Sequence, residues 1–392
     1  MDPRRPRPAG AYRVAWEVGQ YFSPLVIEAE RLRGSGETDT VQVLQQAVHG
    51  WRPRSDRTPD RVTDPDRTIG VATLQLLLTH CDILEVHVRT PLAEVDIDVA
   101  LIKALLHDQF PALTGEVRIV ASGWDNVIAR LGHDLCVRMP RRALSAPLVQ
   151  HEADWLPRLA PTLPADVPTP VAVGEPGLNY AWTWLVCPWF EGRPLADVAV
   201  GDRAVVATQL GTFVTALHRP APEDAPASSW RGISLTDLEP SVVGRLEQVP
   251  PDDAATLRAT WSRCIDAPPH DGPPIWLHGD LHPLNVLAHF DASPALRAII
   301  DWGDVCSGDP ATDLAIAWLA FDKIGRAAFR AAASSRHPLD DPIWDRALAW
   351  AVCLGSLFML DAEPGTTAHG IGKHLLAQLR LDGSCRDATP PL

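Results

Sequence analysis

Apolar and polar positions after residue 94 repeat with two different periods. The stretch "DVALIKALLHDQF" (98–110) carries apolar residues three and four positions apart, which predicts a helix. Three short runs follow at 116–121, 126–131 and 134–139, separated by turns that contain Gly, Asn or Asp. Such runs predict an antiparallel meander of strands. The turn at Ser122 and Gly123 is therefore a candidate for presenting backbone N–H groups to phosphate oxygens.

A second helical pattern, "APLVQHEADWLPRLA" (146–160), places a carboxylate on an apolar face. Glu152 shares that face with Leu148, Trp155 and Leu159 because residues three and four apart are neighbours on a helix. An unpaired buried charge is costly, so Glu152 needs a cationic partner. Arg138, on the third predicted strand, is the expected partner; the alternative is that Glu152 sits at the edge of the stripe and reaches water.

A third pattern predicts a hairpin after residue 284. "NVLAHF" (285–290) and "ALRAII" (295–300) read as strands around the turn "DASP" (291–294). Asn285 and Asp301 each lie eight positions from Ser293 and are expected to face each other across the ladder. An amide and a carboxylate oxygen suit Mg²⁺. Asp280 lies on the loop that enters the same end, where a substrate hydroxyl would be oriented and would lose its proton.

The first quarter of the chain has a different texture and offers no chemistry. The stretch "WRPRSDRTPDRVTDPDRT" (51–68) alternates charges and predicts a loop or a disordered linker. The apolar stretch 71–88 predicts a buried helix or strand. No later segment reads as a membrane span, and no targeting segment is apparent.

Composition narrows the class of protein. A chain of 392 residues exceeds the usual size of one hydrophobic core, which predicts two or more packed units. The net charge of -14 disfavours a nucleic-acid partner, because such proteins neutralise phosphates with clustered Lys and Arg. The seven cysteines are scattered and odd in number, which favours reduced thiols and a cytoplasmic location. No membrane partner is expected, and the sequence leaves the oligomeric state open.

Three blocks together resemble a known family. "HGDLHPLN" (278–285) has the spacing D-x-x-x-x-N of the kinase catalytic loop, and "IIDWGD" (299–304) and "GDPATDLA" (308–315) follow in order. They resemble the signature blocks of the aminoglycoside phosphotransferase family, whose fold is protein-kinase-like. The resemblance implies a two-lobed α+β fold. A small antiparallel-sheet N-lobe at 94–187 would bind nucleotide, a larger and mainly helical C-lobe at 188–392 would hold catalysis and substrate, and residues 1–93 would be an extension of unknown role.

The resemblance also implies roles for individual residues. Asp280 would be the catalytic base, and ATP or GTP would be the phosphoryl donor. The other implied roles are Mg²⁺ ligands for Asn285 and Asp301, supporting residues for His278, Asp309 and Asp313, phosphate cover for Ser122 and Gly123, an anchored phosphate-binding cation for Arg138 and Glu152, and an adenine hinge for "LVCPWFEG" (185–192) with Cys187 and Trp189. Asp309 precedes Pro310 as a helix N-cap would.

One departure and several alternatives remain. Most family members carry Lys where this chain has Arg138, so a catalytically inactive nucleotide-binding module is one alternative. A metallohydrolase with His278, Asp280 and His282 as ligands is another, although Pro283 interrupts the strand that it would need. The acceptor is expected to be a small-molecule hydroxyl. An aminoglycoside-like antibiotic comes first, with Asp304 and Asp322 among the candidate carboxylates, and a macrolide or another small metabolite is the alternative.

Overall fold

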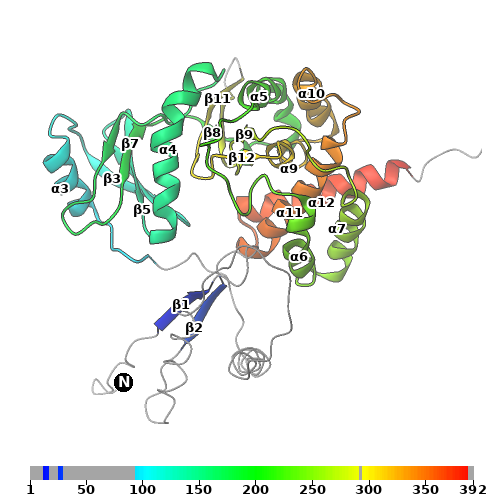
Figure 1. Ribbon diagram of the computed structural model, residues 1–392, viewed down its shortest axis with the longest axis horizontal. Helices are drawn as coiled ribbons and strands as arrows, with labels where there is room; N and C mark the ends of the chain where they lie inside the picture. Colours follow the sequence, from blue (N-terminus) through cyan, green and yellow to red (C-terminus); the bar gives the residue numbers. More distant parts are fainter. Residues whose placement is uncertain (1–11, 17–24, 30–92, 291–293, 387–392) are drawn as a thin grey trace, which may run out of the picture. The chain divides into compact units, whose positions relative to one another are not determined.

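The computed structural model describes residues 12–16, 25–29, 93–290 and 294–386 (Figure 1). The chain divides into two compact units, 1–17 with 24–88 and 18–23 with 89–392. In the first unit, β1 (Tyr12–Trp16) and β2 (Leu25–Ala29) form an antiparallel pair. The predicted linker at 51–68 and the apolar stretch at 71–88 lie outside the described residues. The expected boundary near residue 94 therefore stays a prediction.

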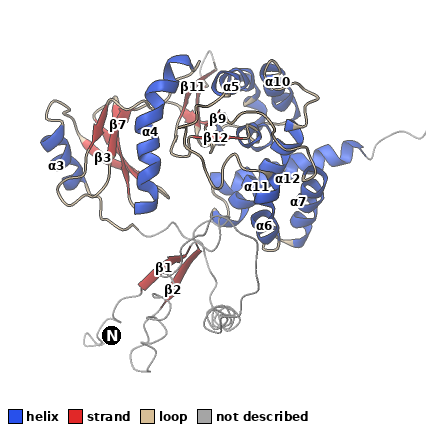
Figure 2. Ribbon diagram, in the orientation of Figure 1, coloured by secondary structure: helices blue, strands red, loops and turns tan. Residues whose placement is uncertain are grey.

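The N-lobe is a five-stranded antiparallel sheet with a helix against each face (Figures 1 and 2). The strand order is β3-β4-β5-β7-β6. The helix and meander predicted from the sequence are both confirmed, with strand bounds within one residue of those expected. Asp98 caps the first helix by accepting a 2.7 Å hydrogen bond from the Leu101 N–H. The elements are α3 (Val99–Gln109), β3 (Val117–Ser122), β4 (Asn126–Leu131), β5 (Leu135–Pro140), α4 (Ala146–Leu159), β6 (Ala172–Gly174) and β7 (Trp184–Pro188).

Strand periodicity decides which side chains meet each helix. Val137 and Met139 of β5 are buried in the cluster that includes Leu105 of α3. Successive side chains point to opposite faces, so Cys136 and Arg138 face α4 instead. Cys136 packs there against the small cluster that includes Cys187 of β7, its partner in the antiparallel register. The sheet thus presents Arg138 to the helix that carries Glu152.

The C-lobe is mainly helical, with two small sheets beside the helices (Figure 2). Helix α11 packs against α6, α7, α8 and α12, and α5 packs against α10. The helices are α5 (Ala204–Leu217), α6 (Leu235–Leu246), α7 (Pro251–Cys264), α8 (Ala311–Leu314), α9 (Ile316–Ala320), α10 (Lys323–Ala333), α11 (Ile343–Asp361) and α12 (Thr367–Arg386). The strands are β8 (Arg193–Pro194), β9 (Ile275–Leu277), β10 (Val286–His289), β11 (Ala295–Ile299) and β12 (Cys306–Gly308).

The hairpin of β10 and β11 is present, but its register differs from the one expected. Val286 pairs with Ile299, and the Ile300 N–H donates to the Asn285 carbonyl at 2.9 Å, so Asn285 lies opposite Ile300 rather than Asp301. The cause is an irregularity between Leu287 and Ala288 that shifts the register by one residue. A bulge of this kind cannot be counted from a symmetric turn.

Helix α11 corrects the expectation that no segment reaches the length of a membrane span. Its 19 residues have a mean hydropathy of 1.4, long and apolar enough to cross a membrane by those two measures. However, 78% of this stretch is buried inside the protein. The apolar composition of α11 is therefore explained by its position in the core of the C-lobe.

Candidate active site

The loop between β9 and β10 is held from behind by one carboxylate. Asp313, fully buried in α8, accepts hydrogen bonds from the backbone N–H groups of His278 at 2.8 Å and Gly279 at 3.0 Å. Its Oδ2 also lies 3.2 Å from Nε2 of His218, whose Nδ1 is 2.9 Å from Nε2 of His337. The bracing contact expected of Asp313 is present, and a buried histidine pair supports it.

His278 is fully committed to holding the same loop. Its Nε2 lies 3.0 Å from the Ile300 carbonyl, and its Nδ1 accepts a 3.2 Å hydrogen bond from the Asp280 N–H. The ring also lies against Trp302, with a centroid distance of 4.7 Å. Both ring nitrogens are used, so His278 cannot serve as the metal ligand that a metallohydrolase would need. Within residues 93–290 and 294–386, no group of three or more His, Cys, Asp or Glu side chains could hold a metal ion.

Gly279 allows the loop between β9 and β10 to approach Asp304, in the signature block at 299–304. Its φ is +84°, a conformation that favours glycine, and an added Cβ would lie 2.2 Å from the Asp304 carbonyl oxygen. The close approach brings Asp280, the next residue, beside Asp304. Two carboxylates from different blocks therefore line the same side of the site.

The Asp280 carboxylate lies between two cationic or polar partners. Its Oδ1 accepts a 2.8 Å hydrogen bond from Nη2 of Arg231, and its Oδ2 lies 3.2 Å from Nε2 of His282. Burial by itself would raise the pKa of the Asp280 carboxyl, but Arg231 and His282 outweigh burial and hold that pKa well below its usual range. Asp280 is therefore ionised at neutral pH and able to accept a hydrogen bond from a hydroxyl.

Asn285 and Asp301 provide oxygen ligands of the kind that Mg²⁺ prefers. The Asn285 amide is oriented by a 3.0 Å hydrogen bond from its Nδ2 to the Asp280 carbonyl. Asp301 follows β11 with φ +62°, a left-handed conformation that Asp tolerates better than most residues. Its side chain is 50% exposed. Two oxygen ligands, completed by phosphate and water, fit Mg²⁺ and do not fit Zn²⁺.

Arg138 contacts residues of both lobes, Glu152 in the N-lobe and Asp301 in the C-lobe. Its Nη2 lies 3.0 Å from Oε1 of Glu152 and 2.5 Å from Oδ1 of Asp301. The ion pair expected between Arg138 and Glu152 is thus present, and Glu152 does not reach water because its exposure is 0%. Burial raises the pKa of Glu152 to about 7, although Arg138 opposes the shift. The contact with Asp301 was not expected from the sequence.

The turn expected to cover phosphates and the segment expected to form the hinge each have one backbone donor that is already used. Ser122 and Gly123 are exposed, but the Gly123 N–H donates to the Asn126 carbonyl at 2.9 Å. Cys187 is buried, and the Trp189 N–H donates to the Asp134 carbonyl at 2.8 Å. These two N–H groups are not free for a nucleotide in this conformation. The proposed nucleotide contacts must come from neighbouring backbone groups.

Asp309 supports the site from the start of α8. Its Oδ1 accepts a 3.0 Å hydrogen bond from the Ala311 N–H, a contact typical of a helix start. Its Oδ2 accepts a 2.7 Å hydrogen bond from Nε of Arg346 on α11, and both side chains are buried. Asp309 therefore connects α8, the short helix that carries Asp313, to α11.

Several residues of the site were not predicted from the sequence to lie beside Asp280 or the residues that support it. His282 and Asp304 lie inside the signature blocks, so their proximity to Asp280 and Asp301 in sequence was a usable signal. Arg231, His218 and Arg346 come from distant segments, and no spacing links them to the loop. The residues concerned are His218, Arg231, His282, Asp304, His337 and Arg346.

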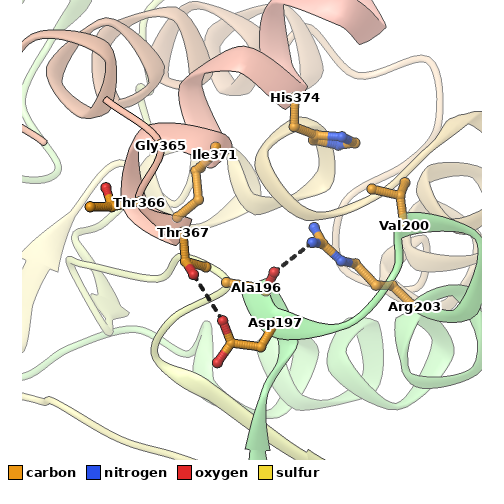
Figure 3. A pocket seen from close by; sticks show the side chains of 10 residues that line it. Ala196, Asp197, Val200, Arg203, Gly365, Thr366, Thr367, Ile371 and His374 are labelled. Atoms are coloured by element: carbon orange, nitrogen blue, oxygen red, sulfur yellow. Dashed lines mark hydrogen bonds between the residues drawn. The ribbon is translucent and has the colours of Figure 1, made fainter. Parts of the chain in front are cut away.

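A separate cavity of about 390 Å³ lies between residues 196–203 and the start of α12 (Figure 3). Its polar groups are already paired within the protein. Thr367 Oγ1 donates to Asp197 at 3.0 Å, and Arg203 Nη2 donates to the Ala196 carbonyl at 2.9 Å (Figure 3). His374 Nε2 lies 3.2 Å from the Phe321 carbonyl. The cavity is therefore a packing feature of the C-lobe rather than a second candidate site.

Comparison with known proteins agrees with this geometry. The viomycin phosphotransferase of Streptomyces vinaceus is 30% identical over 202 residues, which is 47% of this chain and 67% of that protein. The GDP complex of wild-type aminoglycoside 2'-phosphotransferase-IIIa shares the fold, with a TM-score of 0.53 and 20% identity over 73% of this chain and 100% of that one.

A second solved structure gives the same result. The GDP and kanamycin complex of APH(2")-IIia has a TM-score of 0.53 and 19% identity, over 72% of this chain and 98% of that one. At this identity, the two structures show the fold alone. The profile described as "Phosphotransferase enzyme family" matches residues 116–350, which is more than half of the chain. The chain therefore belongs to this phosphotransferase family, and it is a small-molecule kinase with the two-lobed, kinase-like α+β fold.

Proposed function

We propose that the protein transfers the γ-phosphoryl group of ATP or GTP to a hydroxyl of a small molecule, and that Asp280 accepts the proton of that hydroxyl. The observation that carries this proposal is the half-buried Asp280 carboxylate, which Arg231 and His282 keep ionised by holding its pKa low, on a loop whose backbone is hydrogen-bonded to Asn285. The acceptor oxygen forms a bond to the γ-phosphorus while the bond to the β,γ-bridging oxygen breaks. The hydroxyl proton passes to Asp280, and the nucleoside diphosphate leaves.

Asn285 and Asp301 would hold Mg²⁺, and Arg138 would contact the phosphates while Glu152 anchors it. When bound, Mg²⁺ supplies neutralisation of the charge on the β- and γ-phosphate oxygens. An arginine keeps the positive charge of the more usual lysine and adds bidentate binding of phosphate. The ion pair between Arg138 and Glu152 supports an active enzyme over an inactive nucleotide-binding module. The GDP in both structural relatives supports GTP as a donor alongside ATP.

The acceptor class that we propose first is an aminoglycoside-like antibiotic. The viomycin phosphotransferase to which the chain is similar, and the kanamycin bound in one structural relative, support an antibiotic acceptor. A macrolide or another small metabolite is the alternative. The scattered cysteines and the need for nucleoside triphosphate support a cytoplasmic enzyme.

The test is a screen of the purified chain for turnover of Mg·ATP and Mg·GTP against a library of hydroxyl compounds. We expect Asp280→Asn to fold normally and to lose about a hundredfold or more of kcat, because the hydroxyl loses its proton acceptor. Asp340→Asn, at an exposed position after α10, is the matched control and should be unchanged. Near-normal turnover by Asp280→Asn would contradict the proposed role of the loop.

A further inference from the structure

Arg231 places a positive charge directly beside the Asp280 carboxylate. Its Nη2 lies 2.8 Å from Oδ1 of Asp280 and 3.5 Å from Oδ2 of Asp304. The Arg231 side chain is only 16% exposed. Neither the signature blocks nor the family roles discussed above include this arginine, which comes from the segment between α5 and α6.

The loop that carries Arg231 is hydrogen-bonded to residues 307–312, which follow the predicted metal ligand Asp301. The Ser307 N–H donates to the Pro226 carbonyl at 2.8 Å, and the Asp309 N–H donates to the Gly232 carbonyl at 2.9 Å. The Gly232 N–H donates to Oγ1 of Thr312 at 3.0 Å. The Arg231 guanidinium is therefore delivered by an anchored backbone rather than by a loose surface loop.

Gly232 makes this anchoring possible. Its φ is +66°, and an added Cβ would lie 2.7 Å from Cδ1 of Leu277 and 2.9 Å from Cα of Gly308. The loop backbone consequently packs against β9 and β12 at van der Waals distance. The position of Arg231 depends on this contact.

The charges around Arg231 indicate what it does. Without its guanidinium, the half-buried carboxylates of Asp280 and Asp304 would form a cation site, because two neighbouring negative charges that are partly shielded from water attract a counter-ion. Arg231 already fills that role. An ammonium group next to the reacting hydroxyl would therefore meet a paired carboxylate and a nearby positive charge.

We propose that Arg231 is a specificity-determining residue that selects acceptors with no positive charge beside the reacting hydroxyl. The inference rests on the proposed function, since it concerns the same acceptor site. It also refines the acceptor class. Amines of an antibiotic substrate must lie away from the hydroxyl that is phosphorylated, and a neutral or anionic oxygen beside that hydroxyl binds best.

The exposed part of the Arg231 side chain supports the second half of the proposal. An acceptor oxygen next to the reacting hydroxyl could receive a hydrogen bond from this guanidinium, whereas an ammonium group, which has only donors, could not. Asp322, another carboxylate considered for a polycationic acceptor, is already used, because its Oδ1 accepts a 2.9 Å hydrogen bond from Gly325 at the start of α10.

The first experiment tests the cation site without any phosphoryl transfer. The thermal midpoint of each protein is compared in ethylammonium chloride and in equimolar NaCl. We expect the midpoint of Arg231→Ala to be higher in ethylammonium chloride than in NaCl. The midpoints of the unchanged protein and of Arg231→Lys should be the same in both salts. Arg231→Gln, which keeps an amide donor, serves if the alanine variant does not fold. The same ethylammonium effect in all proteins, or in none, would overturn the proposal.

The second experiment tests selection among acceptors. Kanamycin and its fully N-acetylated, uncharged derivative are compared as ligands of each protein by calorimetry, with Mg²⁺ and a non-hydrolysable ATP analogue present. The ratio of their affinities should shift at least tenfold toward charged kanamycin in Arg231→Gln. An unchanged ratio would count against the proposal. Turnover of Mg·ATP and Mg·GTP by the unchanged protein reports on the proposed function, so failure of that function would appear as no turnover with any acceptor while the ethylammonium result still stands.

Discussion

Glu152 is a buried carboxylate whose charge depends on pH within the physiological range. Burial raises its pKa to about 7, and the neighbouring Arg138 only partly offsets this effect. The folded protein therefore holds a proton on Glu152 that the unfolded chain releases above its ordinary pKa. A group of this kind stabilises the fold below that ordinary pKa and loses its contribution as the pH rises toward the folded value.

We predict that this contribution disappears in Glu152→Gln. Between about pH 4.5 and 7, the free energy of unfolding of the unchanged protein should fall relative to that of the variant, by about 2 to 4 kcal/mol. Urea unfolding at closely spaced pH values measures the difference. Glu247→Gln, at an exposed position after α6, is the control. Parallel pH profiles for the unchanged protein and Glu152→Gln would show that Glu152 is not the titrating group.

At the scale of elements, the ion pair of Asp309 and Arg346 connects α8 to α11. Both side chains are 6% exposed, so removing one partner leaves the other charge buried without compensation. We predict that Arg346→Met destabilises the protein by about 3–5 kcal/mol. Urea unfolding of the variant tests this value. The exposed Arg263→Met on α7 should change stability by less than about 0.5 kcal/mol. If the two variants were equally stable, the ion pair would have no structural role.

Elements with strong local patterns were predictable, and contacts between distant elements were not. The bounds of β4 agree with the sequence pattern, and the apolar face of α4 carried enough information to pair Glu152 with Arg138. The register of β10 and β11 was wrong by one residue because a bulge leaves no mark in the periodicity. Arg231 was missed for another reason. Its place beside Asp280 depends on the backbone of Gly232 packing against Gly308, a contact between segments far apart in the sequence.

At the scale of the whole molecule, we predict that a chain beginning at Pro91 folds and binds nucleotide. The first described elements of the N-lobe, α3 and β3, follow residue 93, and the family profile begins at residue 116. The truncated and full-length proteins should therefore show the same ATP-induced rise in thermal midpoint. Loss of that rise on truncation, or aggregation of the shorter chain, would show that residues before Pro91 belong to the catalytic unit.

Two cysteines on neighbouring strands, β5 and β7, allow the opening of the strand that leads into the expected hinge to be measured. Cys136 and Cys187 are register partners, and burial raises the pKa of the Cys136 thiol to about 11. At pH 7 only ~10⁻⁴ of Cys136 would be thiolate, the form that reacts with alkylating reagents. Iodoacetamide should therefore modify these thiols only when β5 and β7 separate. The alkylation rate, followed by mass spectrometry, then reports how often the strand leading into the nucleotide hinge opens, with no engineered label.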